Sequence, residues 1–161
     1  MFAIQPKPAS FTESANSYQV GRNGYIQIDF TPVDPTTNTV VPTGKRTFVL
    51  LMKNVGDILD LDTRIAYDKT TDEEGIFVQY QHKAGEAIKV LRMTKNVDSR
   101  SYKFTYCEVA DGNGESGTPA NAISIDLSYG EVRNIQTLIE YSIPLILGWH
   151  CIYNPSVVAT A

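Results

Sequence analysis

Hydrophobic residues alternate with polar ones over several short stretches of this chain, and this period of two predicts β-strands. The clearest case is the stretch in which Ile123, Ile125 and Leu127 alternate with Ser124 and Asp126. Glycine and polar turn residues separate the stretches, as expected for antiparallel strands. Strands are predicted at Gly24–Phe30, Lys45–Met52, Ile76–Lys83, Ala87–Thr94, Tyr102–Val109 and Ala122–Leu127.

Two segments have the period of a helix instead. Val55 and Ile58 predict a short helix after the second strand. Ser128 and Glu131 form an S-x-x-E capping box, which marks the start of a longer helix. Apolar residues then recur at steps of three and four and form one stripe: Val132, Ile135, Ile139, Ile143 and Ile146.

The order of these elements predicts the fold class. Strands, a short helix, more strands and a long helix indicate an α+β protein with two antiparallel β-sheets, each followed by a helix that covers one face. We expect the first sheet–helix unit at about residues 1–62 and the second at about 75–149. Because 161 residues is an ordinary size for one domain, a single domain over residues 1–161 is expected.

The two cysteines indicate a non-oxidising compartment, because Cys107 and Cys151 have no metal-site spacing and are too few for a disulfide framework. A single disulfide between them is the alternative. The N-terminus has the features of neither a signal peptide nor an Arg-rich transit peptide, and no apolar run approaches the roughly 20 residues of a membrane span. The localisation stays open between an organelle matrix, mitochondrial or plastid, and a bacterial or phage-infected cytoplasm.

The distribution of charge along the chain weakens the conclusion that its net charge suggests about a nucleic-acid partner. A net charge of −4 argues against a nucleic-acid partner. However, the stretch from Ile76 to Tyr106 holds only two acidic residues and six basic ones: Lys83, Lys89, Arg92, Lys95, Arg100 and Lys103. One segment is therefore basic within an acidic protein. The alternative interpretation is a solvated strand face whose lysines prevent aggregation.

A helix that covers one face of a sheet leaves the other face in solvent. With Val78, Val90, Phe104 and Ile125 taken as inward, alternation places lysines, amides and hydroxyls on the outer face. Lysines suit phosphates, rings stack on bases and amides adapt to base edges, so this mixture favours a single strand over a duplex groove. The predicted nucleic-acid contacts are Tyr25, Gln27, Lys45, Gln79, Gln81, Lys83, Lys89, Arg92, Lys103 and Thr105.

The long-helix segment closely resembles the last helix of the Whirly family. The strongest similarity is in Ser142–His150, which ends in the pattern Pro-x-x-x-Gly-Trp. Upstream, Gly24–Pro32 looks like the family's second strand and Val55–Leu59 like its first helix, and Ile88–Val90 resembles a strand of its second sheet. The resemblance spans nearly the whole chain, although the family's lysine-rich signature has no counterpart in this sequence.

This resemblance implies a function and an assembly. Whirly proteins of plants bind single-stranded DNA, and kinetoplastid mitochondrial RNA-binding proteins share their fold. The resemblance implies a non-catalytic, sequence-tolerant single-strand binder, without cofactor or membrane partner, that acts in DNA maintenance, replication, repair or transcription. It also implies two sheets packed as blades and a homotetramer held together by helices. The implied interface residues are Val132, Ile135, Leu138, Ile139 and Ile146.

Other interpretations of the residues remain open. The net charge and the missing lysine signature favour an oligomeric structural or assembly protein that has lost nucleic-acid binding, and a single-stranded RNA-binding or annealing protein is a third option. No phosphate loop and no Ser/His/Asp or Cys/His arrangement supports an enzyme. We expect Trp149 to pack after the helix end. Tyr102 and Tyr106 fit either the core or a stacking platform.

Overall fold

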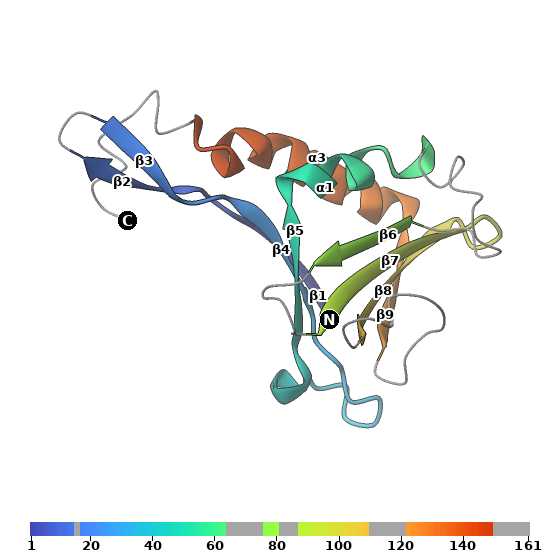
Figure 1. Cartoon of the computed structure of the whole chain (residues 1–161). Coiled ribbons are helices and arrows are strands. Elements are labelled where there is room, and N and C mark those ends of the chain that lie inside the picture. Colours follow the sequence, from blue (N-terminus) through green and yellow to red (C-terminus); the bar gives the residue numbers. More distant parts are fainter. Residues whose placement is uncertain (15–16, 64–75, 81–86, 110–121, 150–161) are drawn as a thin grey trace.

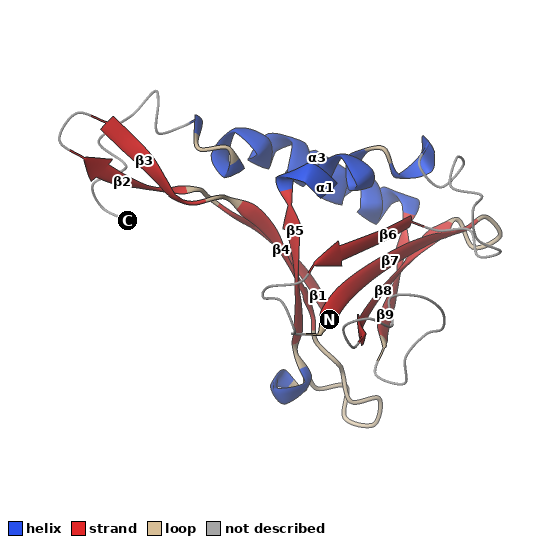
Figure 2. Ribbon diagram, viewed as in Figure 1, coloured by secondary structure: helices blue, strands red, loops and turns tan. Residues whose placement is uncertain are grey.

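The computed structural model describes residues 1–14, 17–63, 76–80, 87–109 and 122–149. Two antiparallel sheets stand at an angle to each other, and two helices lie across the same end of both (Figures 1 and 2). This is the α+β class that the order of elements predicts. No helix within those ranges combines the length and the apolar character that a membrane span requires.

The first sheet has the strand order β1-β4-β5, with β1 (Phe2–Lys7), β4 (Tyr25–Phe30) and β5 (Arg46–Leu51). Two further strands, β2 (Ser10–Ser14) and β3 (Ser17–Arg22), pair with each other as a hairpin. Because β1 runs into β2 and β3 runs into β4, this hairpin continues the sheet as a narrow ribbon that projects from the body (Figure 1). The hydrophobic pattern of the sequence does not predict this ribbon.

The second sheet is a meander in which each strand pairs with the next. Its order is β6-β7-β8-β9, with β6 (Ile76–Tyr80), β7 (Ile88–Asn96), β8 (Ser101–Val109) and β9 (Ile123–Ser128). All three pairings are antiparallel. The four predicted strands of this half are therefore present. The ends of β7, β8 and β9 differ from the expected ones by at most two residues, and the expected end of β6 at Lys83 lies outside the described residues.

Aromatic rings join the inner faces of the two sheets. Phe2 of β1 lies with its ring centroid 5.2 Å from that of Phe30 in β4 and 6.0 Å from that of Phe104 in β8. Phe30 also lies 5.8 Å from Tyr106 of β8. Phe30, Phe104 and Tyr106 are at most 1% exposed. Because these rings touch across the two sheets, both sheets share one core. Burial of such large rings contributes strongly to the stability of the fold.

The two helices form a layer over this core. α3 (Tyr129–Ile146) contacts strands of both sheets, and α1 (Met52–Leu59) lies beside it (Figure 2). Gln136 of α3 donates its Nε2 hydrogen to the backbone carbonyl of Ile58 at 2.9 Å. The last carbonyls of a helix lack intrahelical partners, so this bond satisfies the end of α1 and fixes it against α3.

The start of α3 has the predicted capping box. Ser128 Oγ accepts a hydrogen bond from the backbone N–H of Glu131 at 3.3 Å, and Glu131 Oε2 accepts one from the backbone N–H of Ser128 at 2.8 Å. The Ser128 hydroxyl also donates to Glu131 Oε2 at 2.7 Å, and the hydrogen bonds from the Ser128 hydroxyl and backbone N–H lower the pKa of the exposed Glu131 carboxyl. The apolar stripe that follows then faces inward, because Val132, Ile139 and Ile146 are at most 2% exposed.

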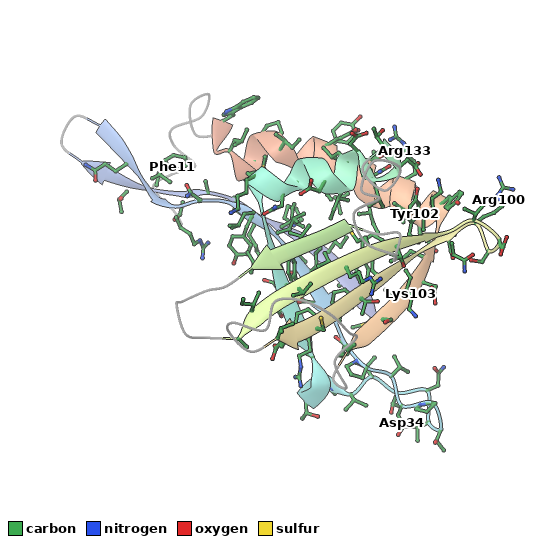
Figure 3. All side chains as sticks on the ribbon, turned by 45° about the vertical axis from the view of Figure 1, so that its right-hand side comes forward. Phe11, Asp34, Arg100, Tyr102, Lys103 and Arg133 are labelled. Atoms are coloured by element: carbon green, nitrogen blue, oxygen red, sulfur yellow. The ribbon has the colours of Figure 1, made fainter. Side chains whose placement is uncertain are left out.

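Two glycines allow the β2–β3 hairpin to meet the end of α3. A Cβ atom on Gly24, at the start of β4, would lie 2.3 Å from the carbonyl oxygen of Ile146. Gly148 has a φ of +75°, and a Cβ there would lie 2.3 Å from the ring of Phe11. Figure 3 shows Phe11 on the hairpin near this end of the helix. The backbones approach closely because both positions lack a side chain.

A polar cluster ties the segment after α1 to the second sheet. Asp62 Oδ1 accepts hydrogen bonds from Lys95 Nζ and from the hydroxyl of Tyr102, both at 2.5 Å. The Lys95 ammonium also lies 5.3 Å from the ring centroid of Tyr129. The hydrogen bonds from Lys95 and Tyr102 lower the pKa of Asp62. This carboxylate and Lys95 therefore neutralise each other.

Candidate nucleic-acid interface

The outer face of the second sheet carries polar side chains over β7, β8 and β9. Lys103 of β8 pairs with Thr94 of β7 on one side and with Asp126 of β9 on the other. In the same way Thr105 pairs with Arg92 and with Ser124. The alternate residues of β8 are Tyr102, Phe104 and Tyr106, whose burial identifies the opposite face as the inner one.

Exposure on this outer face is concentrated at β8 and β9. Lys103, Ser124 and Asp126 are exposed, and Arg92 is half-buried. Thr105 is only 8% exposed, and its Oγ1 lies 2.9 Å from Ser124 Oγ. The predicted contact Thr105 thus has a hydroxyl partner within the sheet. Figure 3 labels Lys103, an exposed cation of this face.

Val90 and Cys107 also belong to the outer face, and both are buried. Burial raises the pKa of the Cys107 thiol, although Arg92 nearby acts to lower it. The expectation that Val90 points inward is wrong. Within the described part of this face, Val90 and Cys107 are therefore not accessible to a ligand, whereas Lys103 is exposed.

Lys89 lies on the inner side of the sheet, which contradicts its predicted position. It has the same parity as Leu91 and Met93, both of which are fully buried. Its Nζ donates to the backbone carbonyl of Thr47 in β5 at 3.2 Å. The alternation is ambiguous here because Val90 and Leu91 are both apolar. Lys89 therefore holds the two sheets together instead of lying beside Lys103.

Asp29 organises the outer face of the first sheet. This carboxylate is 4% exposed and accepts hydrogen bonds from Gln27 Nε2 at 2.9 Å and from Thr47 Oγ1 at 2.7 Å. Lys45 forms a salt bridge with it at 2.8 Å. Burial acts to raise the pKa of Asp29, but the hydrogen bonds from Lys45, Thr47 and Gln27 outweigh it and lower the pKa. Two predicted contacts, Gln27 and Lys45, are therefore partners of this carboxylate.

A second cationic group lies where the hairpin meets the first sheet. The guanidinium carbon of Arg22 lies 5.9 Å from the ring centroid of Tyr25, a predicted stacking residue. Lys7 of β1 pairs with Tyr25 in the register, and its Nζ donates to Gln5 Oε1 at 2.9 Å. Sequence reasoning missed Lys7 and Arg22. The signal that could have found Arg22 is the β-prone run Tyr18–Val20 before it.

The remaining predicted contacts are only partly described. Gln79 lies opposite Val90 in the register of β6 and β7, and its side chain is outside the described part of the chain. Gln81 and Lys83 lie outside the described residues altogether. These three residues stay predictions.

The implied oligomer-interface residues divide into two groups. Val132, Ile139 and Ile146 are buried in the chain's own core, and Ile135 packs against it. Burial contradicts a role for Val132, Ile139 and Ile146 as surfaces for a partner, whereas Ile135 is half-buried and stays a prediction. Leu138 is 42% exposed and remains on the outside of α3. The sheets cover most of the amphipathic stripe of α3, so the stripe belongs to the core of the chain.

Three aromatic residues have defined positions. Tyr102 and Tyr106 are buried in the core, so they do not form a stacking platform. Burial raises the pKa of each, together with hydrogen bonds to Asp62 and Glu108 respectively. Trp149, expected to pack after the helix end, is 50% exposed.

No metal centre is found among the residues that the structure describes: no group of three His, Cys, Asp or Glu side chains there could hold an ion. The outer faces of the sheets offer cations, hydroxyls and the ring of Tyr25. Arg22, Lys7 and Tyr25 form one such group, and Lys103 with Ser124 forms the other. Groups of this kind bind polyanions and planar rings non-covalently.

Comparison with solved structures identifies this arrangement as a Whirly-like α+β fold. The chain is similar to the plant transcriptional regulator PBF-2, with a TM-score of 0.72 and 17% identity over 95% of this chain and 87% of that one. It is also similar to WHY3 from Arabidopsis thaliana, with a TM-score of 0.71 and 15% identity over 98% of this chain and 89% of the other. For WHY1 from the same plant the TM-score is 0.71 and the identity 16%, over 98% and 85% of the two chains. No protein-family model and no curated protein matches the chain.

Proposed function

We propose that this chain binds single-stranded nucleic acid, with DNA as its main ligand. It binds without sequence preference and without catalysis. The observation that carries the proposal is the separation of the two sides of each sheet. The inner sides are filled with rings and aliphatic residues, while cations, hydroxyls and Tyr25 lie on the outer sides. The Whirly-like fold supports the proposal, since PBF-2, which shares it, is a transcriptional regulator.

Four cations supply the electrostatic part of the binding. They are Lys7 on the first sheet, Arg22 at the end of the hairpin strand β3, and Arg92 and Lys103 on the second sheet. Phosphate contacts of this kind position a strand without reading its sequence. Tyr25 adds a ring on which a base can stack, a contact that contributes roughly 1–3 kcal/mol. The proposed contacts are therefore fewer than the sequence predicts and include two residues that it does not.

Self-association belongs to the same proposal. Leu138 is 42% exposed and Tyr141 is 83% exposed on the outside of α3, one turn apart. Large apolar side chains that face solvent side by side mark a surface that another protein covers. A homotetramer through this face would bring several outer sheet faces into one assembly. Its mass can be measured by light scattering after size-exclusion chromatography.

Charge reversal at single residues tests the binding. We would measure fluorescence anisotropy of a labelled dT30 oligonucleotide with the wild type, Lys103→Glu and Arg22→Glu, with a 30-base-pair duplex for comparison. Lys53→Glu on α1 is the matched control, because it changes the charge equally at an exposed position of the helix layer. Each sheet variant should weaken binding about tenfold, a loss of about 1.4 kcal/mol, while the control stays within twofold.

The same titration with a labelled U30 oligonucleotide added, together with the mass measurement, separates the alternative functions. Equal binding by the sheet variants and the control would contradict the proposed surface. An oligomer that binds neither dT30 nor U30 would support the assembly protein, which the net charge of −4 and the neutralised Lys45 and Lys95 favour. Tighter binding of U30 than of dT30 would support an RNA-binding protein.

A further inference from the structure

The side-chain amide of Gln27 has a fixed orientation on the outer face of the first sheet. Gln27 and Asp29 lie two residues apart on β4, and the alternate residues Ile26 and Ile28 are fully buried on the inner face. The Nε2 atom of Gln27 donates to the Asp29 carboxylate, at 3.1 Å from Oδ1 and 2.9 Å from Oδ2. Because the amide nitrogen is turned toward Asp29, the carbonyl oxygen Oε1 is turned away from it.

Asp29 enforces this orientation because it only accepts hydrogen bonds. Burial acts to raise the pKa of Asp29, but the hydrogen bonds from Lys45, Thr47 and Gln27 lower it. The carboxyl group is therefore ionised at neutral pH and has no proton to donate. A reversed amide would place Gln27 Oε1 against the negative charge of Asp29. Only the observed orientation gives both groups a favourable contact.

Gln27 Oε1 is an acceptor that a ligand can use. The Gln27 side chain is half-buried, so part of it faces solvent. Among the residues that the structure describes, none donates a hydrogen bond to this oxygen. A ligand on the outer face that offers an N–H group can therefore bond to it without displacing a protein partner.

The nearest ring on the same face is that of Tyr25. Tyr25 precedes Gln27 by two residues on β4, a separation of roughly 6.5–7 Å along a strand. The Arg22 guanidinium carbon lies 5.9 Å from the centroid of the Tyr25 ring, so a cation for the backbone of a nucleic acid is close by. A base that stacks on Tyr25 therefore has Gln27 as its neighbour along the strand.

We infer that Gln27 Oε1 accepts a hydrogen bond from the Watson–Crick edge of an unpaired base at Tyr25, with Asp29 as the positioning residue. Each of the four natural bases carries an N–H group on this edge, so the contact does not select one base. In a duplex these N–H groups are bonded to the opposite strand, whereas in a single strand they are available. The contact therefore favours single strands over duplexes. This inference rests on the proposed function and assigns a residue that determines its strand specificity.

The test compares two oligonucleotides that differ only in the N–H group. The probes are labelled dT12 and a dT12 in which every thymine is methylated at N3, so both carry the same charge and rings. Gln27→Leu removes the acceptor and leaves Lys45 and Thr47 on Asp29. Asp29→Asn keeps Gln27 but removes the charge that orients its amide. Gln19→Leu, the same substitution at an exposed position of the hairpin, is the matched control.

The wild type should bind dT12 about three- to tenfold more tightly than the methylated probe, as expected for one hydrogen bond. Gln27→Leu should bind the two probes equally within twofold, with unchanged affinity for the methylated probe and for a 30-base-pair duplex. Asp29→Asn should show a smaller preference for dT12 than the wild type, while Gln19→Leu keeps the full preference.

Two results would overturn the inference and leave the proposed function standing. One is a wild type that binds both probes equally, a comparison that needs no substitution. The other is a folded Gln27→Leu variant that keeps the wild-type preference for dT12. A full preference in Asp29→Asn would contradict the positioning role of Asp29. A wild type that binds neither probe would refute the proposed function and the inference together.

Discussion

Lys89 and Thr47 join the two sheets, because the Lys89 ammonium on β7 donates a hydrogen bond to the Thr47 carbonyl on β5 at 3.2 Å. The residue that alternation assigns to a phosphate thus serves the packing of the sheets. Thr47 also binds Asp29 through its hydroxyl at 2.7 Å. Lys89, Thr47 and Asp29 therefore form a polar chain from the junction of the sheets to the outer face of the first sheet.

Lys89→Met should separate stability from binding. The substitution keeps most of the aliphatic stem and removes the donor, so we expect the free energy of unfolding to fall by about 1–2 kcal/mol. Affinity for dT30 should stay within twofold of the wild type. Lys103→Met should show the opposite behaviour, with normal stability and weaker binding. Urea denaturation and anisotropy measure the two properties, and a Lys89→Met variant that binds as weakly as Lys103→Met would place Lys89 on the ligand.

Asp29→Asn should reveal a carboxylate that stabilises the fold above acidic pH. Since the folded-state pKa of Asp29 is lowered, its contribution is present above the unfolded pKa of about 3.9 and is lost as pH falls through the folded value. We expect the free energy of unfolding of Asp29→Asn to lie about 1–3 kcal/mol below that of the wild type at pH 7, and this difference should become smaller below about pH 4. Asp98→Asn in an exposed turn is the control. Urea denaturation at several pH values measures this difference in stability. A difference that stays constant down to pH 2 would rule out a stabilising role of the Asp29 carboxylate.

Asp126→Asn should strengthen nucleic-acid binding. Asp126 is exposed and lies directly across from Lys103, where a carboxylate repels an incoming phosphate. Removal of this charge should raise the affinity for dT30 about two- to threefold at low salt, and the gain should disappear at high salt. Asp60→Asn on the exposed end of α1 should have no such effect. If Asp126→Asn leaves the affinity unchanged, the strand does not pass over this part of β8 and β9.

Gly24→Ala and Gly56→Ala should have opposite effects on stability. A Cβ on Gly24 would lie 2.3 Å from the carbonyl oxygen of Ile146, so the base of the hairpin must move away from α3. We expect a loss of more than about 2 kcal/mol, as for other severe backbone conflicts. Gly56 in α1 has no atom within 4 Å of such a Cβ, and alanine there should add about 0.5–1 kcal/mol. Thermal unfolding gives the melting temperature of each variant. Similar melting temperatures for the two variants would contradict the close packing of Gly24 against Ile146.

The sequence predicts those parts of the fold whose pattern is unambiguous. The capping box at Ser128 and the alternation around Ile125 place α3 and β9 correctly, since each pattern fits one period only. The β2–β3 hairpin has only a weak pattern, because Tyr18 and Val20 are its one alternating pair and Phe11 stands alone on β2. The sequence also predicts the wrong inner face for β7, because Val90 and Leu91 are adjacent apolar residues and either could be the one that points inward.

The candidate site is less predictable than the fold. Lys103 can be placed from the neighbouring Tyr102 and Phe104, which are inward-facing rings on its own strand. The neutralisation of Lys45 by Asp29 depends on the register between β4 and β5, a long-range feature that local patterns do not contain. Arg22 depends on a hairpin that the pattern misses. Side chains that meet across strands thus become visible only in the folded chain.

The salt dependence of single-strand binding tests the central claim most directly. A titration of dT30 between about 50 and 200 mM salt gives the slope of log K against log salt, which for single strands is about −0.7 per phosphate neutralised. Contacts from Lys7, Arg22, Arg92 and Lys103 predict a slope near −3 for each protomer on the strand. A flat dependence, or no complex at micromolar protein in 50 mM salt, would contradict the account.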